Sequence, residues 1–182
     1  MGIKKRLDLF GVFVIAILTA SGGGLLRDIF LNKPVPVFFS DERFFITIVV
    51  SAGAVVIARN KLELIPKYTR VVLWFDAVGL GVFSVLSAYG AMQAGLPGIG
   101  VFFLGCLSGI GGSICRDVLV REIPVVLRKE IYAVACIAGI AVLMVFDGII
   151  GHDGLVYLSV VVVVAVRMLS LRYGIQAPVI KK

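Results

Sequence analysis

Charged side chains are scarce in this sequence. They make up 16% of its 182 residues, with 11 Asp and Glu in all, whereas an ordinary soluble domain has about 25%. Histidine occurs once and cysteine three times. The spacing of Cys106, Cys115 and Cys136 fits no metal site, and an odd number of cysteines gives no disulfide framework. These shortages exclude an ordinary soluble domain, a zinc site and a disulfide scaffold.

Patterns for catalysis are also lacking. The lone histidine, His152, has no ligand set nearby and is predicted to lie in a solvated loop. We find no nucleophile beside a base, no phosphate-binding loop, and no Gly-x-Gly-x-x-Gly after a strand. We therefore expect neither an enzyme nor a bound cofactor. The net charge of +7 comes from basic residues that flank apolar segments, so we expect no nucleic-acid partner.

Hydrophobic residues make up 60% of the chain, and the mean hydropathy is +1.08. Several apolar runs reach roughly 18 residues or more, which is enough for a helix to cross a membrane. A lone strand cannot satisfy its backbone in lipid, so the spans are predicted to be helical. We predict an all-α integral membrane protein with one transmembrane domain, residues 1–182. The predicted spans are 7–31, 42–59, 70–93, 97–120, 130–150 and 153–173.

The basic residues predict how these six spans are oriented. Every Lys and Arg except Arg27, Lys33 and Arg43 lies near the start of the chain, in or after the second half of the last span, or in or close to the links between spans two and three and between spans four and five. Basic residues collect on the cytoplasmic side of membrane proteins. We therefore expect both termini in the cytoplasm and the protein in the cell membrane, with lipid contacts.

A glycine motif occurs twice. Ser21–Asp28 reads Ser-Gly-Gly-Gly-Leu-Leu-Arg-Asp, and Gly109–Asp117 reads Gly-Ile-Gly-Gly-Ser-Ile-Cys-Arg-Asp, with the two arginines 89 positions apart. Each glycine costs a helix roughly 1 kcal/mol relative to alanine, so we expect both helices to be broken there. The first copy is traversed outward and the second inward. This predicts an inverted repeat of 7–59 and 70–150, followed by a final helix at 153–173.

These features resemble the prokaryotic TRIC family of trimeric intracellular cation channels, also described as a putative glycine-transporter domain. The likeness rests on the paired Gly-Gly-x-x-x-Arg-Asp motifs, the prolines after each, and the segments LDLFGVFV and IPVVLRKEIYA. It implies a homotrimer whose subunits each enclose a pore for monovalent cations, chiefly K⁺, lined by the two glycine-broken helices. The family pattern has seven spans, and we expect its first helix to be missing here. A secondary transporter for a small amino acid such as glycine is the alternative.

The motif residues are the candidate site, and each has two interpretations. The glycines and the serine could open a pore or only let helices pack closely. The charged pairs could gate the pore or cap helix ends, and because neighbours do not face each other on a helix, we expect each charge to pair elsewhere. Asp76 is a weaker pore candidate, and Lys129 could touch a gate or lipid headgroups. The candidates are Gly22, Gly23, Gly24, Gly111, Gly112 and Ser113 for the ion pathway, and Arg27, Asp28, Arg116 and Asp117 for gating or charge pairing.

Overall fold

The computed structural model describes residues 7–62, 68–128 and 131–173, and these ranges are all helix and connecting turns. Six longer helices lie where the sequence predicts spans, and two four-residue helices, α2 and α6, follow the glycine motifs. The helices are α1 (Leu9–Phe30), α2 (Val37–Ser40), α3 (Glu42–Leu62), α4 (Tyr68–Gln93), α5 (Gly98–Leu119), α6 (Val125–Arg128), α7 (Ile131–Val145) and α8 (His152–Tyr173).

Four of these helices are long and apolar enough to cross a membrane. They are α1, α5, α8 and the Val71–Gln93 part of α4. Helix α7 is apolar but has only 15 residues, and α3 does not meet the same criteria among the described residues. The prediction of an all-α membrane protein is therefore confirmed for four spans, and six crossings remain a prediction.

The expected breaks at the glycine motifs are wrong. Helix α1 runs unbroken through Gly22–Gly24, and α5 runs unbroken through Gly111–Ser113. The glycines with positive φ in the described residues are Gly95 and Gly148, both in turns. A glycine weakens a helix by roughly 1 kcal/mol, whereas an unpaired backbone group in lipid costs several kcal/mol. The need to keep the backbone hydrogen-bonded outweighs the low helix propensity of glycine, so the helix continues.

Both motif helices end in the same turn. Asn32 and its counterpart 89 positions later, Arg121, take the left-handed conformation with φ of 50° and 55°. The next amide, of Lys33 or Glu122, then donates to the carbonyl of Asp28 or Asp117 at 3.0 and 2.8 Å. This bonding pattern is the Schellman motif, which satisfies the last free carbonyls of a helix. The two copies therefore share backbone structure as well as sequence.

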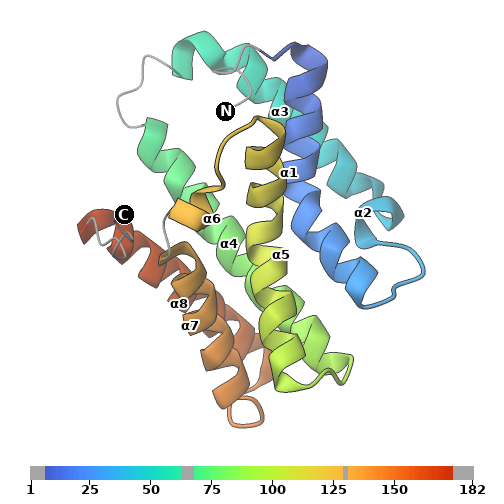
Figure 1. The fold of residues 1–182 in the computed structure, drawn as a ribbon, viewed down its shortest axis with the longest axis vertical. Coiled ribbons are helices and arrows are strands. Elements are labelled where there is room, and N and C mark those ends of the chain that lie inside the picture. The colour runs from blue at the N-terminus through green and yellow to red at the C-terminus, as the bar shows by residue number, and fades with distance from the viewer. Residues whose placement is uncertain (1–6, 63–67, 129–130, 174–182) are drawn as a thin grey trace, which may run out of the picture.

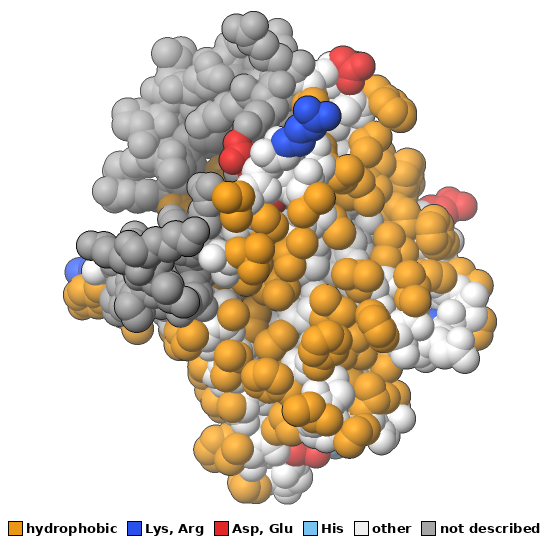
Figure 2. Space-filling model, viewed as in Figure 1, with side chains coloured by type: hydrophobic (Ala, Val, Ile, Leu, Met, Phe, Trp, Pro, Cys, Tyr) orange, Lys and Arg blue, Asp and Glu red, His pale blue; other side chains and the backbone are white. Residues whose placement is uncertain are grey.

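The helices surround one apolar core. Figure 1 shows α1 and α5 side by side and running in opposite directions. Helices α4, α5, α7 and α8 pack on one another, whereas α3 lies at the edge and packs on α1 and α2. The middle of the face in Figure 2 is covered by hydrophobic side chains. Such a wide exposed apolar surface suits contact with lipid or with other membrane helices.

Candidate functional site

The glycines form a close seam between α1 and α5. A Cβ placed on Gly23 would overlap the carbonyl oxygen of Ser108, and one placed on Gly112 would overlap that of Thr19. A Cβ on Gly22 would lie 3.3 Å from the Cα of Gly112. Small residues let membrane helices approach at the backbone. The glycines therefore allow α1 and α5 to pack closely, which is one of the two interpretations given above.

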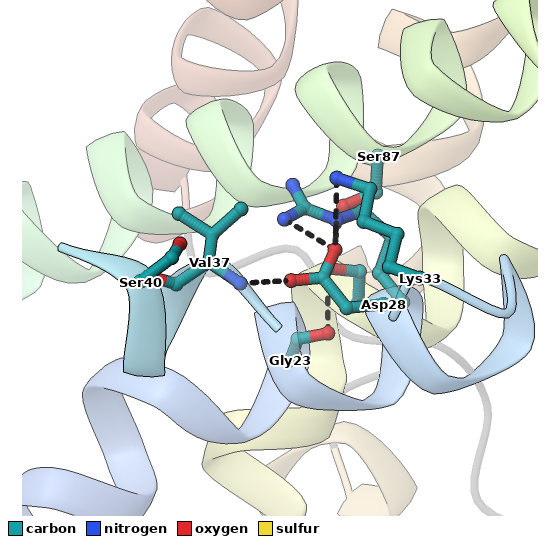
Figure 3. A network of polar contacts seen from close by, with 8 residues as sticks. Gly23, Asp28, Lys33, Val37, Ser40 and Ser87 are labelled. Atoms are coloured by element: carbon teal, nitrogen blue, oxygen red, sulfur yellow. Dashed lines mark hydrogen bonds and ion pairs between the residues drawn. The ribbon is translucent and has the colours of Figure 1, made fainter. Parts of the chain in front are cut away.

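Two buried serines bridge this seam to α4. The Ser87 hydroxyl donates to Ser108 Oγ at 2.6 Å, and the Ser108 hydroxyl donates to the carbonyl oxygen of Gly23 at 3.0 Å. Both serines are at most 2% exposed. Figure 3 shows Gly23 and Ser87 on facing helices at this point. These two hydrogen bonds link α4 to α5 and α5 to α1 in an otherwise apolar interior. Each bond replaces one that the buried polar group would otherwise form with water.

A central cavity of about 210 Å³ lies beside the seam. Its volume holds several water molecules, and its wall supplies the polar partners that buried water needs. Hydroxyls, one carboxylate and one guanidinium share the wall with aromatic and aliphatic groups. The lining residues are Thr19, Ala20, Gly23, Phe75, Asp76, Gly79, Leu80, Phe83, Ser108, Gly109, Gly112, Ser113, Arg116 and Tyr132.

The first charged pair is tied into a network at the end of α1. Asp28 is 1% exposed, and its Oδ1 accepts from Arg27 Nε at 2.8 Å and lies 3.2 Å from Lys33 Nζ. Its Oδ2 accepts from the Val37 amide at 2.9 Å, at the start of α2 (Figure 3). One carboxylate thus holds the last turn of α1, the following loop and α2 together. A buried carboxylate needs this many donors to offset its loss of water.

The second pair repeats the first contact. Arg116 Nε donates to Asp117 Oδ1 at 2.8 Å, and Asp117 is fully buried. The expectation that neighbouring charges would pair elsewhere is therefore wrong for both arginines. Each arginine side chain instead reaches the carboxylate of the next residue, in the last turn of its helix. Each buried carboxylate is therefore paired with the arginine that precedes it in its own motif.

The predicted residues do not all meet in one place. Gly23, Gly112, Ser113 and Arg116 line the central cavity. Gly24, Arg27 and Asp28 line a separate hollow of about 240 Å³ with α2 and α4. Gly22 and Gly111 lie buried in the seam. Lys129 lies outside the described residues.

Some of the residues at the central cavity lie outside the two glycine motifs. Asp76 on α4 accepts from the Tyr132 hydroxyl on α7 at 3.2 Å. Arg167 on α8 lies behind them, with Nη2 4.0 Å from Asp76 Oδ2 and its guanidinium 4.6 Å from the centre of the Tyr132 ring. One signal in the sequence could have found Arg167, since it is a charged residue within the apolar run of the last span. Tyr132 lies in the segment IPVVLRKEIYA, which supports the family resemblance, but no charge or repeated pattern there indicates a cavity residue.

A larger groove of about 680 Å³ lies between α1 and α3. Its wall is mostly apolar, with Asp41 and Arg43 at one end of α3 and Thr47 and Ser51 along it. No motif residue lines it.

The sequence matches known proteins over most of its length. A family model described as glycine transporter matches residues 1–61 and 73–148. A UPF0126 membrane protein of Deinococcus radiodurans is 40% identical over 141 residues, which are 76% of this chain and 64% of that protein. The UPF0126 inner membrane protein YadS of Escherichia coli K12 is 33% identical over 177 residues, 96% of this chain and 84% of the relative. The chain thus spans about two thirds of the first relative's length and more of the second.

Solved structures share the fold. One, reported as the structural basis for conductance through TRIC cation channels, superposes with a TM-score of 0.91 at 27% identity, over 100% of this chain and 88% of that chain. A prokaryotic TRIC channel crystallised in 0.5 M KCl gives 0.84 at 31% identity, over 95% and 87%. The chain is therefore a membrane protein of the prokaryotic TRIC family of trimeric intracellular cation channels, whose sequence model bears the description glycine transporter.

Proposed function

We propose that this protein is a passive channel for monovalent cations, chiefly K⁺, with a pathway inside each subunit of a homotrimer. The observation that carries the proposal is the central cavity at the contact of α1 and α5. Its hydroxyls and the Asp76 carboxylate are oxygen ligands of the kind that replace a cation's water. The likeness to TRIC cation channels supports the same function.

The charges near the cavity fit a cation pathway. Arg116 lines the cavity, but its Nε donates to Asp117 at 2.8 Å. This contact offsets a positive charge that would otherwise repel a cation. Arg27 is offset by Asp28 in the same way. We propose that these two pairs flank the pathway and control entry, and that the seam glycines set its width.

We further propose that the two motifs face opposite sides of a cell membrane, with both termini in the cytoplasm. The antiparallel packing of α1 and α5 supports this (Figure 1). Cysteines introduced singly at the matched turn positions, Asn32→Cys and Arg121→Cys, test it in a background without native cysteines. An impermeant maleimide should label the first in intact cells and the second only after permeabilisation. Equal labelling of both in intact cells would rule out the inversion.

A transporter for a small amino acid is the second candidate. The cavity carries a carboxylate at Asp76 and a guanidinium at Arg116, which together could hold the two charged ends of glycine. The description of the family model points the same way. An occluded site for a zwitterion would need both charges unpaired, whereas Arg116 already has a partner. This favours the channel.

Recording from purified protein in planar bilayers separates the two candidates. The channel predicts discrete current steps in symmetric KCl, and a reversal potential that shifts when a K⁺ gradient is imposed. In liposomes it predicts no saturable uptake of labelled glycine. Saturable glycine uptake without current steps would instead identify a transporter.

A further inference from the structure

The cluster of Asp76, Tyr132 and Arg167 joins three helices at the wall of the central cavity. Asp76 and Tyr132 line the cavity, and the Tyr132 hydroxyl donates to Asp76 Oδ1 at 3.2 Å. Arg167 does not line the cavity, and its Nη2 lies 4.0 Å from the other oxygen of the same carboxylate, Oδ2. It comes from α8, which lies outside both predicted repeats. The final helix therefore places a cation behind two of the residues that line the cavity.

Arg167 is incompletely paired for a buried charge. Its side chain is 4% exposed, and its Nε has no hydrogen-bond partner among the described residues. Its guanidinium rests on the face of the Tyr132 ring, 4.6 Å from the centre. A buried guanidinium normally forms close, often paired, hydrogen bonds to a carboxylate. The 4.0 Å separation leaves the Asp76 carboxylate only partly engaged.

Asp76 is the one carboxylate among the cavity-lining residues that the structure describes. The other charges nearby are Arg116, which donates to Asp117, and Arg167 itself. The side chain of Asp76 is 27% exposed, so it is open to the cavity. Its negative charge is therefore available both to an ion in the cavity and to Arg167 behind it.

We propose that Asp76 is the cation-binding carboxylate of the cavity and that Arg167 is a built-in competitor for it. A monovalent cation and the guanidinium attract the same carboxylate from opposite sides. Any displacement of α8 that brings Arg167 closer weakens the ion site, and withdrawal strengthens it. The final helix thereby sets how tightly the pathway holds its ion. This inference rests on the proposed function and assigns the ion site within it.

The test compares ion binding in three variants of the full-length protein. Removing the competitor in Arg167→Gln should tighten the site, whereas Asp76→Asn should abolish it. The readout is the rise in thermal unfolding temperature with KCl relative to N-methylglucamine chloride at equal ionic strength. We expect half-maximal K⁺ stabilisation at about five-fold or more lower concentration in Arg167→Gln, the lower end of coupling between two sites. Arg172→Gln is the matched control, since it removes the same charge from an exposed position on α8.

Conductance in bilayers supplies the second readout. The K⁺ concentration for half-saturating current should fall in Arg167→Gln by the same factor and stay unchanged in Arg172→Gln. Identical K⁺ dependence in Arg167→Gln and Arg172→Gln would overturn the inference. If Arg167→Gln does not fold, unchanged K⁺ stabilisation in Asp76→Asn would overturn it equally. If the wild type carries no current but the stabilisation pattern holds, the proposed channel function fails while the ion site stands.

Discussion

The two halves of the molecule carry the same motif in different surroundings. In the second half, α4 fills the space between α5 and α7, and Cys136 and Ile140 are fully buried. Their counterparts 89 positions earlier, Thr47 and Ser51, are exposed and line the open groove between α1 and α3. The turns and arginine–aspartate pairs at the motif ends are nevertheless alike. The motif therefore determines its local structure by itself, and burial of the rest depends on a third helix.

The two halves meet at the seam between α1 and α5. Disrupting this seam should have the largest effect on folding and on cation flux. The double variant Gly23→Leu/Gly112→Leu places two large side chains where even a methyl group overlaps a facing carbonyl. We expect no folded protein and no cation flux. The single variants Gly23→Ala and Gly112→Ala should each cost about 1–3 kcal/mol, as overpacking does.

Gly24→Ala is the matched control for these variants, because a Cβ there meets nothing within 4 Å. It should retain or slightly raise stability, since alanine favours helix by roughly 1 kcal/mol. Oligomer crosslinking and liposome flux measure both outcomes. A folded, conducting Gly23→Leu/Gly112→Leu protein would show that the helices do not touch as described.

The buried aspartates should give the next largest effect. Asp28→Asn and Asp117→Asn each remove the carboxylate partner of an arginine, and breaking such a pair costs about 3–5 kcal/mol when it is buried. Their arginines are 17% and 20% exposed, which places both variants at the lower end of that range. Thermal unfolding in detergent measures the loss. Unchanged stability in either variant would mean that its aspartate is in contact with water. The two motif ends would then not share a buried arginine–aspartate pair.

One matched pair of positions tests the difference in burial between the halves. Ile140→Ala leaves a cavity beside α4 and should cost about 2–5 kcal/mol. Ser51→Ala, at the counterpart position in the open groove, should change stability by at most about 0.5 kcal/mol. Denaturation of the two purified variants side by side gives the difference. Equal losses would show that something covers the groove in the membrane.

Hydropathy alone predicted the positions of the longer helices, because membrane spans need long apolar runs. The end turns at Asn32 and Arg121 were only hinted at by the prolines that follow. The continuity of α1 and α5 could not be predicted from helix propensity. Helix propensity describes each glycine in isolation. The close packing of α1 and α5, by contrast, requires residues without a Cβ where a carbonyl of the other helix lies opposite.

The site was predicted in part. Gly23, Gly112, Ser113 and Arg116 carry a repeated pattern that is visible in the sequence, and they line the cavity. Tyr132 lies outside the glycine motifs, in the segment IPVVLRKEIYA, and reaches the cavity through the packing of α7 on α4 and α5. Such a contact depends on tertiary structure, which periodicity along the chain does not encode.

The cavity beside the seam is the proposed route of the ions. The direct test is Ser113→Cys in a background without native cysteines, recorded in bilayers before and after a positively charged methanethiosulfonate reagent. Ser113 lines the cavity, whereas the control, Val161→Cys on α8, is 61% exposed on the outer surface. We predict that modification stops K⁺ current in Ser113→Cys and leaves it unchanged in Val161→Cys. Full current through Ser113→Cys protein that mass spectrometry shows to be modified would contradict this route.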